Sequence, residues 1–175
     1  KKPSVVMICI TCVDALLGTD MERVCRKAEE ATGLPVKPCY MYALTREGRK
    51  PPMVHVRQSI YSLLEPRKKK GNVVNLLGYF SPLVDDCELY DLLHGAGVKT
   101  IHEISRCKDY EEYQTMSEAN FNLVLHPEAR FAAEDFHDRL KIPYIELRRL
   151  YQIDKIASQY RAFGAALGVE FDDEK

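Results

Sequence analysis

Short apolar runs recur along this chain, and each is followed by a stretch with helical spacing. This alternation limits the possible folds more than any other feature. Six runs are expected to be strands, over residues 5–10, 36–39, 73–77, 98–104, 121–125 and 142–146. They are apolar without polar alternation, which is typical of parallel strands covered on both faces. Because the sequence has no Asn-Gly or Asp-Gly hairpin signal, right-handed crossovers should join the strands. The sequence predicts a Rossmann-like, three-layer α/β fold with six β/α units and a doubly wound, mostly parallel sheet.

The clearest internal boundary is the basic run Arg67–Lys70, which Gly71 follows. It predicts a first βαβα part over residues 1–66, a second Rossmann-like part over 71–169 and a tail over 170–175. The chain does not begin with Met, and an apolar run starts at Val5. We therefore expect an internal fragment of a longer subunit.

The composition excludes several classes of protein. A net charge of −1 gives no general electrostatic reason to bind nucleic acid or an anionic membrane. No apolar run in the sequence approaches the roughly 20 residues that a membrane span needs. Six cysteines without a secretory signal favour burial, thiol chemistry or metal binding over disulfides. We expect a cytoplasmic protein.

Metal-competent side chains follow or close four of the predicted strands. Open parallel sheets bind ligands beyond the carboxyl ends of their strands, so Cys12, Cys39, Cys107 and His126 are expected at one edge. Cys107 and His126 follow neighbouring β/α units and should be the pair that approaches. Thiolate and neutral imidazole both bind soft or borderline metals.

Other interpretations of these residues stay open. Each of the three cysteines can equally be an idle thiol, and His126 can be a helix N-terminal residue whose ring faces solvent, because Pro127 follows it. Cys9 and Cys12 have redox-motif spacing, but the next helix is expected to begin only at about Thr19. The two remaining cysteines are placed away from the edge: Cys25 on an apolar helix face and Cys87 in the first turn of a helix.

Common nucleotide and hydrolase motifs are absent from the sequence. The turn Gly78-Tyr79-Phe80-Ser81-Pro82 has a single glycine in place of Gly-x-Gly-x-x-Gly. There is no Walker A sequence and no Gly-x-Ser-x-Gly elbow. A nicotinamide site, a nucleoside triphosphate site and a serine hydrolase site are therefore disfavoured.

Several segments match one known family in order along the chain. The segment Thr11–Met21 has the pattern Cys-x-x-x-Leu-Leu-Gly-x-Asp, and further matches are Leu34–Cys39, Val74–Gly78, Leu92–Val98, Ala119–Val124 and Ile142–Tyr144. The chain thus resembles the nitrogenase component 1 family. That family includes the α and β chains of the molybdenum–iron protein, cofactor-assembly scaffolds and dark-operative protochlorophyllide reductase.

The resemblance implies roles for two residues. Cys12 matches the cysteine that ligates an iron–sulfur cluster shared between two subunits. The family's other cluster cysteines of the same subunit lie upstream of this segment. Because one thiolate cannot hold a cluster that needs about four ligands, no metal is expected in the fragment alone. His126 stands at, or within one residue of, the cysteine that anchors the catalytic cofactor in the nitrogenase α chain.

The resemblance also implies an activity and partners. The parent would be an oxidoreductase that takes electrons from an ATP-dependent iron–sulfur reductase protein and passes them through the cluster to a small-molecule substrate. A second component 1 type subunit would complete the cluster site. The alternatives are a non-catalytic metallocofactor-assembly scaffold or a small-ligand-binding α/β domain. No catalytic residue is assigned, and Cys39, Cys107 and His126 are the expected cofactor-binding residues.

Overall fold

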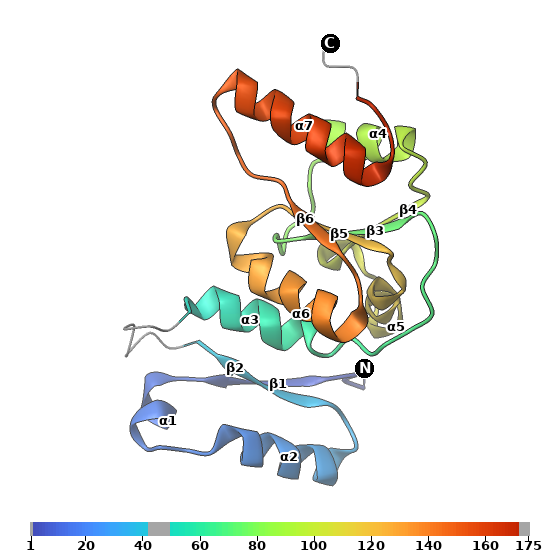
Figure 1. Cartoon of the computed structure of the whole chain (residues 1–175). Helices are drawn as coiled ribbons and strands as arrows, with labels where there is room; N and C mark the ends of the chain where they lie inside the picture. Colours follow the sequence, from blue (N-terminus) through green and yellow to red (C-terminus); the bar gives the residue numbers. More distant parts are fainter. Residues whose placement is uncertain (1, 42–49, 172–175) are drawn as a thin grey trace. The chain divides into compact units, whose positions relative to one another are not determined.

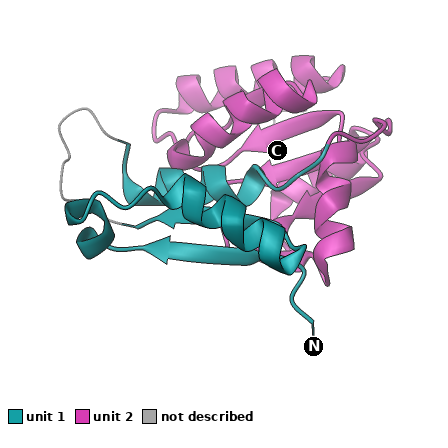
Figure 2. Cartoon of the chain, turned by 90° about the horizontal axis from the view of Figure 1, so that it is seen from below, with its two compact units in different colours: residues 1–65 teal, residues 66–175 magenta. Residues whose placement is uncertain are grey.

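A computed structural model describes residues 2–41 and 50–171 of the chain. The chain divides into two compact units, residues 1–65 and 66–175, coloured teal and magenta in Figure 2. Every strand pair within the described residues is parallel. None of the described helices has the length and apolar character needed to cross a bilayer.

The first unit contains a two-stranded sheet. Its elements are β1 (Val6–Ile10), α1 (Cys12–Leu16), α2 (Met21–Thr32), β2 (Val36–Tyr40) and α3 (Pro52–Tyr61). β1 and β2 pair in parallel register, and both α2 and α3 pack against β2. Asp20 caps α2, because its carboxylate accepts the backbone N–H of Arg23 at 3.0 Å. Gly33 ends α2 in the left-handed region.

The second unit contains a four-stranded sheet. Its strands are β3 (Val73–Leu77), β4 (Thr100–Glu103), β5 (Phe121–Val124) and β6 (Tyr144–Glu146), in the order β4-β3-β5-β6. Its α-helices are α4 (Glu88–Gly95), α5 (Tyr110–Gln114), α6 (Arg130–Leu140) and α7 (Ile153–Leu167). Short 3-10 helices η1 (Ile104–Arg106), η2 (Thr115–Glu118) and η3 (Pro127–Ala129) complete the described elements.

The helices of the second unit form two layers around its sheet. α4 and α7 lie on one face, and α5 and α6 lie on the other (Figure 1). All five residues of the central strand β3 are buried, as expected for a strand covered on both sides. Val74, Leu123 and Phe163 belong to the core under α4 and α7. This arrangement is the three-layer α/β fold that the sequence predicted.

The pairing of the strands differs from the prediction in one respect. All six predicted strands are present within two residues of their expected bounds, and the parallel pairing is confirmed. They form two sheets instead of one, with β1 and β2 apart from the other four. The physical reason is that an apolar run determines where a strand lies but not which strand it pairs with.

The predicted boundary and tail also have structural roles. Arg67 of the basic run pairs with Glu111 at 2.7 Å, and Lys70 pairs with Glu118, so the run is fastened to the second unit. Phe171, assigned to the tail, packs its ring against Phe163 with 5.2 Å between centroids. The packed part of the chain therefore reaches residue 171, and tail residues 172–175 lie outside the described residues.

Candidate functional site

The strand order of the second unit defines where a ligand would be expected to bind. From β3 the chain crosses to β4 on one side, and it then returns to β5 on the other side of β3. The carboxyl ends of β3 and β5 therefore flank a topological switch point, where open α/β sheets bind their ligands. Gly78 follows β3 at this point, and Leu125 and His126 follow β5.

The two loops at the switch point touch through their backbones. Gly78 has φ of 140°, a conformation that residues with a Cβ rarely adopt. A Cβ atom added to Gly78 would lie 2.8 Å from both the Cβ and the backbone nitrogen of His126. The N–H of Leu125 donates to the carbonyl of Leu77 at 2.8 Å, which extends the ladder into the loop. The backbone position of His126 is thus fixed by its neighbours.

His126 begins the helical segment that leads into α6. Its Nδ1 accepts the backbone N–H of Glu128 at 3.3 Å, so the residue caps η3. The ring is partly exposed and lies edge-on to the Tyr79 ring, with 5.7 Å between centroids. In the neutral ring an accepting Nδ1 leaves the proton on Nε2. Metal ligation by Nε2 would therefore require the proton to move to Nδ1 and would break the cap.

A third loop brings positive charge to the same site. The Arg149 guanidinium donates to the Tyr79 hydroxyl at 3.3 Å, while Arg148 pairs with Glu146 at 2.9 Å. Gln159 of α7 holds this loop through the backbone N–H and carbonyl of Arg148, at 2.8 and 3.0 Å. Tyr79 and Arg149 were missed by the sequence analysis. The available signals were a glycine ending a buried strand and an arginine pair following the last strand.

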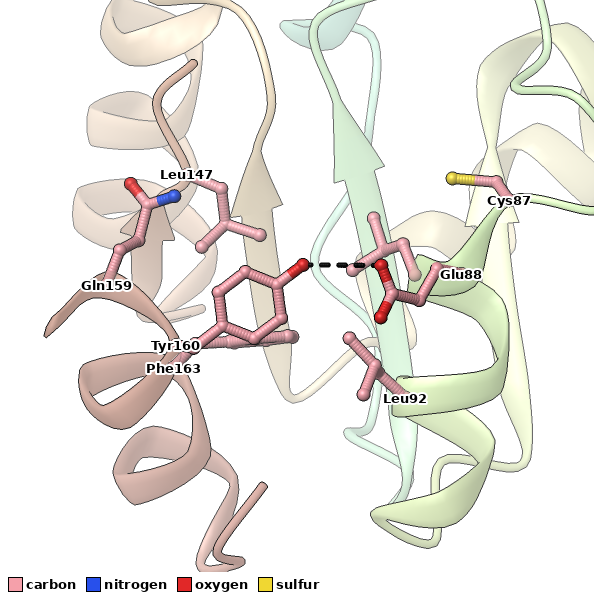
Figure 3. A pocket seen from close by; sticks show the side chains of 8 residues that line it. Cys87, Glu88, Leu92, Leu147, Gln159, Tyr160 and Phe163 are labelled. Atoms are coloured by element: carbon pink, nitrogen blue, oxygen red, sulfur yellow. Dashed lines mark hydrogen bonds between the residues drawn. The ribbon is translucent and has the colours of Figure 1, made fainter. Parts of the chain in front are cut away.

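Two adjoining cavities open beside these loops. The outer cleft, of about 470 Å³, is lined by residues of the β3–α4 and β6–α7 loops, among them Tyr79, Arg148 and Arg149. The inner pocket, of about 200 Å³, lies between α4 and α7 (Figure 3). Both cavities are lined by Cys87, Leu89 and Leu147. The sequence analysis placed Cys87 away from the site, but its side chain reaches both cavities.

Cys107 is not a neighbour of His126 in the sheet. It follows β4, and β3 lies between β4 and β5, so the expected approach of the two residues was wrong. The Cys107 thiol donates to the carbonyl of Glu103 at 3.4 Å. The pKa of Cys107 is raised to about 11, mainly by burial and to a smaller extent by the charges of Glu112 and Asp109. At neutral pH this thiol is protonated and points back at its own strand.

Cys39 and Cys12 both belong to the first unit but differ in exposure. Cys39 is buried within β2, opposite Cys9 in the β1–β2 register. The pKa of the Cys39 thiol is raised, mainly by burial and to a smaller extent by the charge and hydrogen bond of Cys9. Cys12 is exposed and is the first residue of α1, a short helix that the sequence analysis did not expect, whereas the helix expected from about Thr19 is α2, which begins at Met21. The Asp14 carboxylate accepts the N–H of Thr11 at 3.0 Å and stabilises this start.

Three exposed apolar side chains follow Cys12 in the chain. Val13, Leu16 and Leu17 have 61%, 78% and 74% of their surface exposed. Within residues 2–41 and 50–171, no group of three His, Cys, Asp or Glu side chains could hold a metal ion. Cys12 fits the role of one accessible thiolate ligand, and the remaining ligands of a cluster would have to come from elsewhere.

The second unit, with its parallel sheet, two helical layers and a cleft at the switch point, defines a doubly wound α/β protein. Over residues 1–175 the chain matches the model of the family described as nitrogenase component 1 type oxidoreductase, and it belongs to that family. The resemblance inferred from the sequence motifs is thereby confirmed.

The chain is similar to curated proteins named nitrogenase iron-molybdenum cofactor biosynthesis protein NifE. The Nostoc sp. protein is 27% identical over 95% of this chain and 35% of its own length. The Klebsiella pneumoniae protein is 26% identical over 95% of this chain and 39% of its own. The chain therefore spans little more than a third of these relatives. The solved structure "Nitrogenase Cp1 at pH 5" has a TM-score of 0.65 and 20% identity over 95% of this chain and 34% of that one, which supports the fold.

Proposed function

We propose that the chain is part of a component 1 type subunit that serves as a scaffold in metallocofactor assembly, with a metal–sulfur cluster as its cargo. The observation that carries this proposal is the incomplete site at Cys12, one exposed thiol followed by exposed apolar side chains in and after α1. Relatives named for cofactor biosynthesis support assembly over substrate reduction.

The surface around Cys12 supports a shared cluster. An iron–sulfur cluster needs about four ligands, and this segment offers one. Exposed apolar patches next to a ligand are typical of surfaces that a partner covers, here formed by Val13, Leu16 and Leu17. We propose that a second component 1 type subunit covers α1 and supplies further thiolates, so that the cluster lies between the subunits.

The switch-point site supports a place for the cargo in the second unit. A neutral imidazole is a good ligand for iron and other borderline metals, and His126 presents a partly exposed ring there. The Arg149 guanidinium adds positive charge beside it through Tyr79. Since Nδ1 is used in the cap, ligation by Nε2 would exchange one hydrogen bond for a metal bond. Cys39 and Cys107 are less suited, because Cys39 is buried, Cys107 is partly buried, and burial raises the pKa of both thiols.

The first experiment tests the shared cluster. The full-length parent, with its partner subunit, is purified anaerobically as wild type, Cys12→Ala and Cys25→Ala, and iron and acid-labile sulfide are measured. Cys25 is buried on α2 and serves as the matched control. We expect Cys12→Ala to lose the bridging cluster and Cys25→Ala to retain it. Equal iron content in Cys12→Ala and wild type would refute the assignment.

The second experiment separates assembly from reduction. A reductase, the other function that the family suggests, would turn over substrate with an ATP-dependent iron–sulfur partner while keeping its metal. A scaffold instead transfers its cluster to an apo acceptor protein. We expect transfer to be impaired in His126→Ala and in His126→Asn, because Asn restores the cap but not the imidazole. Rescue by Asn would show that His126 acts only as a cap.

A further inference from the structure

The inner pocket and the outer cleft adjoin the proposed place for the cargo and share Tyr79 and Arg149 with it. We propose that together they bind a small organic carboxylate, with its apolar body between α4 and α7 and its carboxylate at Arg149. This inference rests on the cavities of the second unit alone and does not depend on the proposed function. The ligand class follows from the size, lining and charge of the two cavities.

The inner pocket is sized for one ring or a short branched chain. Its volume is about 200 Å³, and Leu89 and Leu92 of α4, with Leu147 and Phe163, form half of its lining residues. An apolar cavity of about 150 Å³ in another protein stays dry and binds benzene. Figure 3 shows Leu92 on α4 and Phe163 on α7 facing the same space. An apolar ligand body is therefore expected here.

One side of the inner pocket carries a negative charge. The Tyr160 hydroxyl donates to the Glu88 carboxylate across the space between the two helices at 3.5 Å (Figure 3). Burial, followed by the charge of Glu88, raises the pKa of Tyr160, so its hydroxyl stays protonated. A ligand carboxylate beside Glu88 would be repelled. The anionic end of the ligand is therefore expected to point away from α4, into the outer cleft.

The outer cleft supplies the matching positive charge. Arg148 and Arg149 both line it, but Arg148 is paired with Glu146. Among the described residues, the Arg149 guanidinium donates to the neutral hydroxyl of Tyr79. Its guanidinium is thus not matched by a carboxylate within the described part of the chain. Because guanidinium binds carboxylates through paired hydrogen bonds, Arg149 is the residue that selects the anionic end.

The test uses the 175-residue chain and four small probes. Phenylacetate has the ring and the carboxylate, phenylacetamide lacks the charge, acetate lacks the ring, and phenethylamine reverses the charge. Binding is measured by calorimetry and by ligand-observed NMR. We expect phenylacetate to bind about tenfold or more tightly than phenylacetamide, the difference expected of one charge-assisted hydrogen bond. Acetate and phenethylamine should not bind measurably.

Variants separate the two parts of the site. Arg149→Gln should reduce phenylacetate binding to the level of the amide, while Arg130→Gln, the same charge change on α6 at the other face of the sheet, should leave it unchanged. Leu92→Phe should fill the inner pocket and abolish binding. Leu92→Ala should enlarge it and admit naphthylacetate, which the wild type should reject.

Several outcomes would overturn the proposal. The first is equal affinity for phenylacetate and phenylacetamide. The second is tighter binding of phenethylamine than of phenylacetate, and the third is no binding of any probe at millimolar concentration. If Leu92→Phe does not fold, the Leu92→Ala variant is sufficient as a test. Its failure to bind naphthylacetate would refute the claim that the inner pocket holds the apolar part of the ligand. None of these results bears on the iron content of the Cys12→Ala parent, so the two proposals fail separately.

Discussion

Replacing Gly78 by alanine should destabilise the second unit strongly. The new Cβ would lie 2.8 Å from two atoms of His126, one of them backbone, and neither can rotate away. Backbone strain for an L residue at φ of 140° costs about 1–3 kcal/mol, and overpacking adds about 1–3 kcal/mol. We therefore expect a loss of about 2–6 kcal/mol in the free energy of unfolding. At about 4 °C per kcal/mol for a unit of this size, the midpoint should fall by about 8–24 °C.

The assay follows the second unit directly. Urea unfolding of the 175-residue chain is monitored by hydrogen–deuterium exchange of peptides from β3 and β5, together with a thermal scan. Gly95→Ala is the matched control, because a Cβ there meets nothing within 4 Å and the position is helical. It should be neutral or stabilise the protein by up to about 1 kcal/mol.

A Gly78→Ala protein within about 0.5 kcal/mol of the wild type would refute the reasoning. It would mean that the loops after β3 and β5 can separate without loss, and that His126 is not held where the structure places it. NMR signals of His126 and Tyr79 would then show whether the ring contact between them survives the substitution.

Three further predictions concern other groups. Asn75 donates to Asn122 at 2.7 Å within the sheet, so Asn75→Leu should cost about 1–3 kcal/mol in urea unfolding and the double leucine variant less than the sum of the singles. Maleimide should label exposed Cys12 much faster than buried Cys39 in native protein; equal rates by mass spectrometry would contradict the burial. Burial, followed by a hydrogen bond to a buried carboxylate on β4, raises the pKa of Tyr90 to about 12, so its contribution to stability is complete below pH 10 and lost as the pH rises through 12. Urea titrations at pH 9 and 11 should show this loss in wild type and a smaller one in Tyr90→Phe.

The sequence predicted the elements well because burial leaves a local pattern. β3 is apolar on both faces since helices cover both, and a run of that kind can be recognised without any partner. Strand pairing leaves no such trace. The division between β2 and β3 and the order β4-β3-β5-β6 depend on contacts between distant segments. The expectation that Cys107 approaches His126 failed for this reason.

The candidate site was only partly predictable. His126 was found because a histidine before a proline after a buried strand is a local signal, and its capping role was among the alternatives considered. Arg149 acts through Tyr79, 70 residues away in the chain, and no spacing rule links them. Cys87 was excluded because it was expected within the first turn of a helix, whereas α4 begins at Glu88, one residue after it. Each residue turns a side chain by about 100° about a helix axis, so a small error in the start of a helix is enough to move a side chain from one surface to another.

The division of the chain into a two-stranded and a four-stranded unit has a consequence for any measurement of its stability. In the two-stranded sheet each strand is hydrogen-bonded to a neighbouring strand along one edge only. β3, in contrast, is paired along both edges, with β4 and with β5. Amides of β1 and β2 should therefore exchange with solvent faster than those of β3, and the two units should unfold in separate steps. A single melting temperature would then average two transitions and describe neither of them.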